Sequence, residues 1–379
     1  MRIAFLVEDL SGKSGWSRYA LDLGNALMKR KHEVHTLVHR GTPGIPWATQ
    51  HPILPETLRA MHPLLCMFHS ACLRRCLQNI QPSIVHSIAE PYGLLLGLTP
   101  KEHWKTFLTL HGSYAVTPLR IGPCTRFLAR RALARADRII TVSNFTRNFL
   151  RHEEPLLWKQ LHLEEKTFVL HNAVDCDAFH MHVSPPASQE HHVLSVGAVK
   201  ERKGYREMIL ACAAFRKENP EVRLRYTIIG SLTQDPRYVA SIRSLIAQHG
   251  LADIVTLRGN VDDAELYRAY TQSSLFMLLS QKRGTDFEGF GLVFLEAAAM
   301  GIPVIGPNTG GCPEAIAEGR SGFVVDPSDS RAVANRMQDI LVKRAINSKE
   351  CRQWAEQHTA TRTAGELEEH YKNVLKEPT

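Results

Sequence analysis

A glycine-rich turn, a helix and a stop signal follow one another in residues 288–303, which read EGFGLVFLEAAAMGIP. The glycine and the proline at its end are expected to stop a helix that begins near Gly291. Apolar runs that are typical of strands flank this helix, Leu275–Leu279 before it and Pro303–Ile305 after it. A strand, a helix and a second strand in this order predict two parallel strands joined by a crossover helix.

The same alternation extends over the whole chain and divides into two series. The first series is expected to contain strands at Ile3–Val7, Glu33–Val38, Ser83–His86, Thr106–Leu110, Arg138–Val142 and Thr167–Leu170, and helices at Ser17–Lys29, Pro55–Gln78 and Thr125–Ala136. The second series is expected to contain strands at Val193–Val196, Arg223–Ile229, Ile254–Leu257, Leu275–Leu279, Pro303–Ile305 and Gly322–Val325. Near-continuous apolar strands between helices predict an α/β protein with two Rossmann-like, doubly wound domains.

The boundary between the two domains is predicted at residues 184–188, Ser-Pro-Pro-Ala-Ser, because prolines with small polar neighbours are typical of linkers. The N-terminal domain is therefore expected to span residues 1–184 and the C-terminal domain residues 185–357. A final helical pattern, Thr361–Leu375, has no strand after it.

Two glutamates bracket the first turns of the helix described above. Glu288 precedes the helix and Glu296 lies about two turns along it, so the spacing is expected to place their carboxylates on the order of 12 Å apart. That separation suits a nucleotide sugar from its hexose to its ribose. The free N–H groups at Gly289–Gly291 suit a diphosphate between them. A solvated glutamate is the alternative, but the apolar neighbours of Glu296 disfavour it.

This stretch resembles the Glu-x7-Glu element of the retaining glycosyltransferases of family 4, which adopt the GT-B fold. Further segments resemble that family in order and spacing over nearly the whole chain: Thr109–Gly112, Ala136–Ser143, His171–Asp175, Val196–Gly204, Arg258–Val261, Gly310–Glu314 and Gly322–Pro327. The resemblance implies two domains that face each other across a cleft. It also implies that the last helix, residues 358–379, returns to the N-terminal domain.

The resemblance assigns roles to individual residues. Glu288, with the backbone N–H groups of Gly289, Phe290 and Gly291, would bind the hydroxyls of the donor sugar. Glu296 would bind the ribose. Further donor contacts are implied at Gly197 in the diphosphate loop and at Val261 beside the base. Lys203 would neutralise the departing diphosphate, where negative charge grows in the transition state.

One residue departs from the family pattern. Many relatives carry an arginine directly after the glycine of the diphosphate loop, where this chain has Ala198. Lys200 and Arg202 are the candidate substitutes, and we expect Arg202 to face the phosphates. If neither does so, catalysis is in doubt, and a nucleotide-sugar-binding protein that partners an active transferase becomes the alternative.

Two N-terminal positions complete the predicted site. His111 ends a strand, where open α/β sheets bind ligands, and by resemblance it orients the donor sugar near the reacting centre. Gly15, by the same resemblance, lets the backbone approach the donor phosphates or the acceptor. The run Gly12–Ser14 is not a P-loop, because the upstream glycine of that motif would fall at Val7.

Composition limits the remaining choices. The 379 residues are 44% hydrophobic and 22% charged, which is typical of a globular protein. No apolar run approaches the roughly 20 residues that cross a bilayer. Residues 1–9 are expected to form a strand and not a signal peptide, so we expect a cytoplasmic protein. The eight cysteines lack disulfide and zinc spacing, and an Asp-x-Asp motif is absent, so no metal or other cofactor is expected. Histidines near the linker are interpreted as exposed: His180, His182, His191 and His192.

A net charge of +8 favours anionic partners. Arginines and apolar residues alternate within residues 61–75 and 120–135, and basic amphipathic helices can lie on anionic membranes. A core-facing helix with solvated arginines explains the pattern equally well. Nucleic acid is not expected, because no basic–aromatic pattern supports it.

The sequence thus predicts a retaining glycosyltransferase that moves a hexose from a UDP- or GDP-sugar to a hydroxyl. The acceptor would be lipid-linked or a glycan, in cell-envelope polysaccharide synthesis, and the protein would be peripheral on the inner face of the membrane. An epimerase or phosphorylase on the same architecture remains a second alternative.

Overall fold

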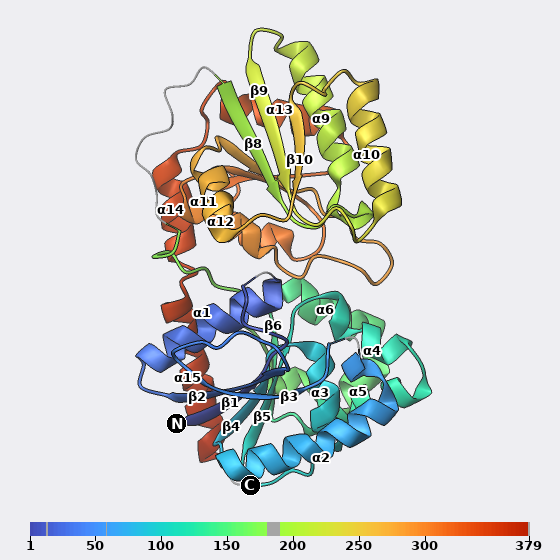
Figure 1. Ribbon diagram of the computed structural model, residues 1–379, viewed down its shortest axis with the longest axis vertical. Coiled ribbons are helices and arrows are strands. Elements are labelled where there is room, and N and C mark those ends of the chain that lie inside the picture. The colour runs from blue at the N-terminus through green and yellow to red at the C-terminus, as the bar shows by residue number, and fades with distance from the viewer. Residues whose placement is uncertain (13, 58, 180–189, 378–379) are drawn as a thin grey trace. The chain divides into compact units, whose positions relative to one another are not determined.

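The computed structural model describes residues 1–12, 14–57, 59–179 and 190–377, which form two compact units. One unit combines Met1–Ala173 with Thr359–Thr379, and the other contains Val174–His358. Each unit is a parallel sheet with helices packed around it (Figure 1). The predicted α/β class with two doubly wound domains is therefore confirmed. The linker predicted at residues 184–188, and with it His180 and His182, lies outside the described residues.

The N-terminal unit contains a seven-stranded sheet in the order β3-β2-β1-β4-β5-β6-β7. Its strands are β1 (Arg2–Leu6), β2 (Glu33–His39), β3 (Thr49–Leu54), β4 (Ile84–Ser87), β5 (Lys105–Leu110), β6 (Arg138–Thr141) and β7 (Thr167–Val169). Its helices are α1 (Gly15–Lys29), α2 (Pro63–Ile80), α3 (Glu90–Leu98), α4 (Thr117–Arg120), α5 (Pro123–Arg135), α6 (Asn144–Glu153), α7 (Pro155–Gln160), α8 (Leu163–Lys166) and α15 (Ala360–Lys376). The order reverses direction between β1 and β4, so a topological switch point lies there.

The last helix, α15, belongs to the N-terminal unit, as the resemblance implied. Its residues Ala364, Leu367 and Tyr371 are buried in one core with residues of β1 and α1. The Tyr371 hydroxyl lies 2.6 Å from Nδ1 of buried His86 on β4. A carboxylate at the edge of this packing, Glu368 Oε2, accepts a hydrogen bond from Arg30. The chain end is thus tied to the first helix by both apolar burial and an ion pair.

The sequence analysis missed one strand of the N-terminal unit and misplaced the start of one helix. The strand β3 was not predicted, because Pro52 interrupts its pattern; β3 occupies the sheet edge, where a missing N–H is tolerated. The helix predicted from Pro55 begins at Pro63 instead, after a short 3-10 turn at Arg59–Met61. Proline suits the first helical position, because its absent N–H would have no partner there.

The C-terminal unit contains a six-stranded sheet in the order β10-β9-β8-β11-β12-β13. Its strands are β8 (Glu190–Val196), β9 (Arg223–Ile229), β10 (Val255–Gly259), β11 (Leu275–Met277), β12 (Val304–Pro307) and β13 (Gly322–Val325). Its helices are α9 (Tyr205–Glu218), α10 (Pro236–Gln248), α11 (Asp263–Thr271), α12 (Leu292–Ala299), α13 (Ser330–Leu341) and α14 (Ser348–Glu356). The order reverses direction between β8 and β11, so the topological switch point of this sheet lies there. Most of the predicted strands begin and end within three residues of the observed bounds.

None of the described helices has the length and apolarity needed to cross a membrane.

Candidate functional site

The charged centre of the C-terminal unit lies where β8 and β11 end. Glu288, in the turn before α12, forms ion pairs with two basic residues of the loop after β8. Lys203 Nζ lies 2.6 Å and Arg202 Nη1 3.0 Å from the same oxygen, Glu288 Oε2. Burial alone would raise the pKa of Glu288, but the two cations outweigh it and lower that pKa to about 2. The carboxylate is therefore ionised and held by both cations.

The loop that carries the two cations is fixed by its backbone. Residues 201–203 form a 3-10 turn that ends at Gly204, whose φ is +72°. A Cβ at Gly204 would stand 1.9 Å from the carbonyl oxygen of Leu279, so only glycine fits. The Gln281 N–H donates to the carbonyl of Arg202 at 2.7 Å. These contacts hold the loop against the segment that follows β11.

Lys200 adds a third positive charge to this loop. Its burial, together with the charges of Arg202 and Lys203, lowers the pKa of Lys200. Ala198, in the same loop, is uncharged, so the positive charge of this loop comes from Lys200, Arg202 and Lys203.

Two glycines hold the backbone of Glu288 from the far side of the turn. The Gly311 N–H donates to the Glu288 carbonyl at 2.8 Å. Gly310 has a φ of +64°, and a Cβ there would lie 2.5 Å from the same carbonyl oxygen. No side chain larger than hydrogen fits at Gly310 without displacing Glu288.

The residues between Glu288 and α12 form the start of that helix. Gly289, Phe290 and Gly291 are buried, and Gly291 is the residue before the first helical turn, with φ +86°. A Cβ on Gly291 would stand 2.6 Å from the ring of Phe294. The first N–H groups of a helix lack partners further back in the helix, so this end of α12 carries a positive partial charge.

Glu296 lies further along α12 and is buried. The hydroxyl of Tyr270, itself fully buried at the end of α11, donates to Glu296 Oε2 at 2.9 Å. A buried carboxylate needs such donors to remain in place. Val261, two residues beyond β10, is half-buried, and Gly197, directly after β8, accepts a 2.6 Å hydrogen bond from the Tyr205 hydroxyl.

The equivalent sheet edge of the N-terminal unit carries His111, directly after β5. The turn after β4 fixes it twice: His111 Nε2 lies 2.9 Å from the Ile88 carbonyl, and the His111 N–H donates to Glu90 Oε1. Burial lowers the pKa of His111 to about 4, so its ring is neutral near pH 7. With Nε2 donating to Ile88, Nδ1 is the nitrogen that can accept a hydrogen bond.

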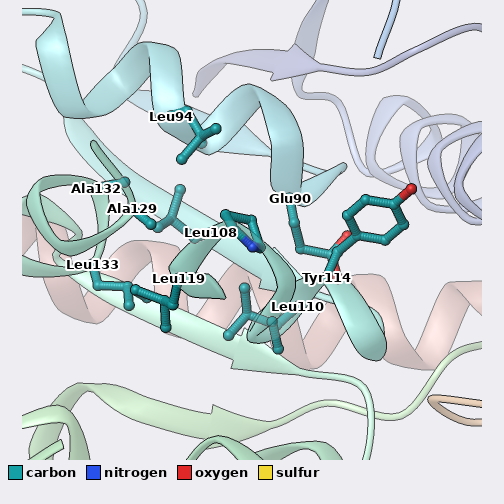
Figure 2. Close-up of a pocket in the computed structure, with 12 residues that line it drawn as sticks. Glu90, Leu94, Leu108, Leu110, Tyr114, Leu119, Ala129, Ala132 and Leu133 are labelled. Atoms are coloured by element: carbon teal, nitrogen blue, oxygen red, sulfur yellow. The ribbon is translucent and has the colours of Figure 1, made fainter. Parts of the chain in front are cut away.

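Glu90 begins α3 and is itself buried. Burial raises the pKa of Glu90 to about 7, against backbone hydrogen bonds that lower it. Figure 2 shows its carboxyl beside Tyr114, at the end of an apolar cavity of about 30 Å³ between α3, β5 and α5. Such a volume holds about one water molecule.

Aromatic rings lie against His111 and against Tyr114, the neighbour of Glu90. The ring of Tyr19 meets His111 edge to face at 4.9 Å, and Trp16 meets Tyr114 at 5.2 Å. Gly15, the first residue of α1, is exposed, and a Cβ there would meet nothing within 4 Å. The space in front of Gly15 is therefore open within its own unit.

Two family models match the chain in succession. The model described as Glycosyltransferase Family 4 matches residues 13–178, and the model described as Glycosyl transferases group 1 matches residues 178–360. The chain belongs to glycosyltransferase family 4.

Individual family members resemble parts of this chain. A D-inositol 3-phosphate glycosyltransferase of Paenarthrobacter aurescens is 33% identical over 187 residues, which is 48% of this chain and 44% of that protein. A GDP-mannose-dependent alpha-(1-6)-phosphatidylinositol monomannoside mannosyltransferase of Mycobacterium tuberculosis is 33% identical over 154 residues, or 40% and 38% of the two chains. The matches thus span less than half the length of these curated relatives.

Solved structures share the GT-B fold of family 4 over the full chain. Sucrose-phosphate synthase from Thermosynechococcus elongatus superposes with a TM-score of 0.79 at 19% identity and covers 99% of both chains. Anabaena HepE in complex with UDP-glucose has a TM-score of 0.74 at 17% identity and covers 98% of this chain and 100% of its own. At this identity the likeness shows the fold.

The structure brings some predicted site residues together and leaves others apart. Lys203, Arg202 and Glu288 meet at one carboxylate oxygen. Glu296 is held separately by Tyr270. Within the described ranges, no three metal-ligating side chains lie close enough to hold a metal ion.

Three supporting groups escaped the sequence analysis: Tyr270, Glu90 and the contact of Gly310–Gly311 with Glu288. The last belongs to the motif Gly310–Glu314 quoted above. Its two glycines are compatible with a close backbone contact, but the sequence does not identify Glu288 as the residue contacted. Tyr270 and Glu90 carried no such signal, since a helical tyrosine usually packs in a core and a glutamate at a helix start is usually solvated.

Proposed function

We propose that this protein is a retaining hexosyltransferase that moves a hexose from a UDP- or GDP-sugar to a hydroxyl acceptor in the synthesis of a cell-envelope glycan or glycolipid. The observation that carries the proposal is the convergence of Lys203 and Arg202 on Glu288, with a second buried glutamate, Glu296, further along the same turn and helix.

Donor binding exchanges partners within this charged centre. The diphosphate takes Lys203 and Arg202 from Glu288, and the start of α12 supplies N–H groups to the same phosphates. Glu288, released from its cations, accepts hydrogen bonds from hydroxyls of the donor hexose. Because Lys200 adds a further positive charge, the cations of this centre outnumber the Glu288 carboxylate, which suits a diphosphate.

The chemical step breaks the bond between the anomeric carbon and the diphosphate oxygen. Negative charge develops on that oxygen, and Lys203 and Arg202 are already in place to stabilise it. The acceptor hydroxyl forms the new bond to the anomeric carbon and passes its proton to the departing diphosphate oxygen, so the products are the glycoside and the protonated nucleoside diphosphate. The resemblance to retaining members of the family supports retention of configuration.

Glu296 and His111 are assigned positioning roles. Glu296, held in place by the Tyr270 hydroxyl, is assigned to the ribose hydroxyls. His111 offers neutral Nδ1 to a sugar hydroxyl, because Ile88 holds its other nitrogen. Gly197, Val261 and the backbone of Gly289–Gly291 complete the donor contacts, and Gly15 leaves room for the donor or the acceptor.

The names of similar proteins support the choice of donor. The mannosyltransferase of Mycobacterium tuberculosis is named as GDP-mannose-dependent, and Anabaena HepE was solved with UDP-glucose. We propose that the acceptor is presented at an anionic membrane surface and that the protein is peripheral there. No divalent cation is required in this proposal, since protein cations and α12 hold the diphosphate.

A thermal-shift panel tests the donor site. UDP, GDP, ADP and their common sugar conjugates are compared on the wild type and on Glu296→Ala, in the presence of a chelator. Selective stabilisation by the uridine or guanosine series, weakened in Glu296→Ala, is expected. No shift from any nucleotide at millimolar concentration would contradict the proposal.

The anomeric configuration of the product tests the reaction. Transfer with retention, followed by NMR of the new glycosidic bond, is the expected result. Nucleotide binding without any transfer would favour a non-catalytic partner of another transferase. Dependence on inorganic phosphate, or an isomerised sugar without acceptor, would favour a phosphorylase or an epimerase.

A further inference from the structure

An apolar surface lies on the N-terminal unit at the first turns of α2 and α5. Leu64, Met67 and Phe68 of α2 are 70%, 63% and 67% exposed, and Phe127 of α5 is 56% exposed. The three α2 residues stand at i, i+3 and i+4, so they share one helical face. We call these four side chains the α2–α5 patch. Large apolar side chains grouped in this way mark an interaction surface.

A hollow opens within this patch. It has a volume of about 370 Å³, and it is lined by Pro63, Met67, Leu98, Pro123, Cys124, Phe127 and Leu128. All of these residues come from helices α2, α3 and α5, which pack against one another in this unit (Figure 1). The volume lies in the range of pockets that bind small ligands, about 300–1,000 Å³. Its lining holds no charged side chain, so it suits a hydrocarbon.

The two helices that carry the patch contain positive charge only. Helices α2 and α5 together contain six arginines and no aspartate or glutamate. The guanidinium of Arg131 lies 5.6 Å from the centre of the Phe127 ring, directly beside the patch. Glu102 and Glu154, the carboxylates that pair with Arg74 and Arg126, come from other segments. Arg75 on α2 and Arg131 on α5 are exposed.

Apolar side chains at the centre with arginines beside them match one kind of surface. Anionic lipid headgroups pair with arginine, while acyl chains accept leucine, methionine and phenylalanine. We infer that the α2–α5 patch inserts into an anionic lipid bilayer and that the hollow receives one hydrocarbon chain of a lipid. This inference rests on the proposed membrane acceptor and names its class: a hydroxyl carried on an anionic lipid.

Vesicle flotation of the whole protein tests the surface. Phosphatidylcholine vesicles are compared with vesicles that also contain phosphatidylglycerol, and binding is expected only with the anionic lipid. Phe68→Ser and Phe127→Ser are each expected to lower the partition coefficient about tenfold, since each removes a large apolar side chain from lipid. Val342→Ser, which removes an exposed apolar side chain of the C-terminal unit, is the matched control.

Charge reversal tests the arginines separately. Arg75→Glu and Arg131→Glu are each expected to reduce binding to phosphatidylglycerol vesicles several-fold, by about 1 kcal/mol of lost attraction per removed arginine. Arg331→Glu, at an exposed arginine of the C-terminal unit, is expected to leave binding unchanged. Equal binding to neutral and anionic vesicles, or equal losses in the control, would overturn the inference.

Cys124 gives a direct readout of the hollow, because it lines the hollow and is exposed. An environment-sensitive fluorophore on Cys124, in a Cys72→Ser/Cys76→Ser background, is expected to be quenched by lipids brominated on the acyl chain. Flotation without such quenching would show that no chain enters the hollow.

These results remain distinct from a failure of the proposed transferase activity. Vesicle binding needs no donor, so it persists if no sugar is transferred. Conversely, loss of vesicle binding with intact nucleotide stabilisation would overturn this inference alone.

Discussion

The two units place different chemistry at the carboxyl edges of two similar parallel sheets. In the C-terminal unit, Lys203 and Arg202 share one oxygen of an ionised Glu288. In the N-terminal unit, His111 is neutral near pH 7, and Glu90 has a pKa raised to about 7 by burial. The sheets are alike, so the difference arises in the loops.

This contrast indicates a division of labour. The charged carboxyl edge of the C-terminal sheet, which we call the charged edge, can stabilise the departing diphosphate. The nearly neutral carboxyl edge of the N-terminal sheet, the neutral edge, is lined by aromatic rings and can orient a sugar by hydrogen bonds and shape. Charge removal should therefore be most damaging in the C-terminal unit. Loss of a hydrogen bond should matter most in the N-terminal unit.

The largest effect is expected from Lys203→Ala. Loss of a preplaced cation at the leaving diphosphate should lower kcat about 100-fold, measured by release of nucleoside diphosphate. Lys217→Ala, at an exposed lysine of α9 in the same unit, should retain wild-type kcat. A kcat within about twofold of wild type in Lys203→Ala would show that Lys203 does not stabilise the departing diphosphate.

A smaller effect is expected from His111→Ala. The lost hydrogen bond to the sugar should lower kcat about tenfold, while the Kd for the nucleoside diphosphate stays unchanged, since the proposal assigns the nucleotide to the C-terminal unit. His103→Ala, at an exposed histidine of the same unit, serves as control. A raised Kd for the nucleotide in His111→Ala would contradict the proposed separation of roles between the two units.

Tyr270→Phe should weaken nucleotide binding about fivefold, since it removes one hydrogen bond to Glu296 and keeps the buried ring. Calorimetric titration of the nucleotide measures this change. Tyr226→Phe also removes a buried hydroxyl in this unit, one that bonds Ser195 in the core. Equal weakening in both variants would make Tyr270 merely structural.

The smallest effect concerns the pH dependence of stability. The pKa of Glu90 is raised from 4.5 to about 7 in the folded protein, so its burial costs stability progressively as pH rises through that window and no further above it. Relative to wild type, Glu90→Gln should gain a few degrees in Tm between pH 5 and pH 7. Scanning calorimetry at several pH values measures the difference. Parallel Tm curves for the two proteins would show that Glu90 does not titrate there.

The sequence predicted the charged edge better than the neutral one, because motifs differ in how local they are. Glu288, Glu296 and the glycines between them lie within one short turn and helix, and Arg202 and Lys203 share one loop. Local spacing is therefore enough to group them, although the shared oxygen of Glu288 was visible only in the structure.

The neutral edge is assembled from segments that are far apart in the chain. The start of α1, the segment from the end of β4 to the start of α3 and the residue after β5 each contribute to it. The residues next to Glu90 in the sequence do not predict its burial, because Pro91 indicates only that a helix begins there. Edge strand β3 and the late start of α2 were likewise missed, because the effect of Pro52 and of Pro63 depends on where each proline lies in the fold.

The central claim is that Lys203 and its neighbours hold the diphosphate of the donor. Titration calorimetry with a nucleoside diphosphate and the matching monophosphate, UDP with UMP or GDP with GMP, tests it directly on the wild type and on Lys203→Ala. The wild type is expected to prefer the diphosphate at least about tenfold, and most of this preference should disappear in Lys203→Ala. An equal preference in both proteins would contradict the account.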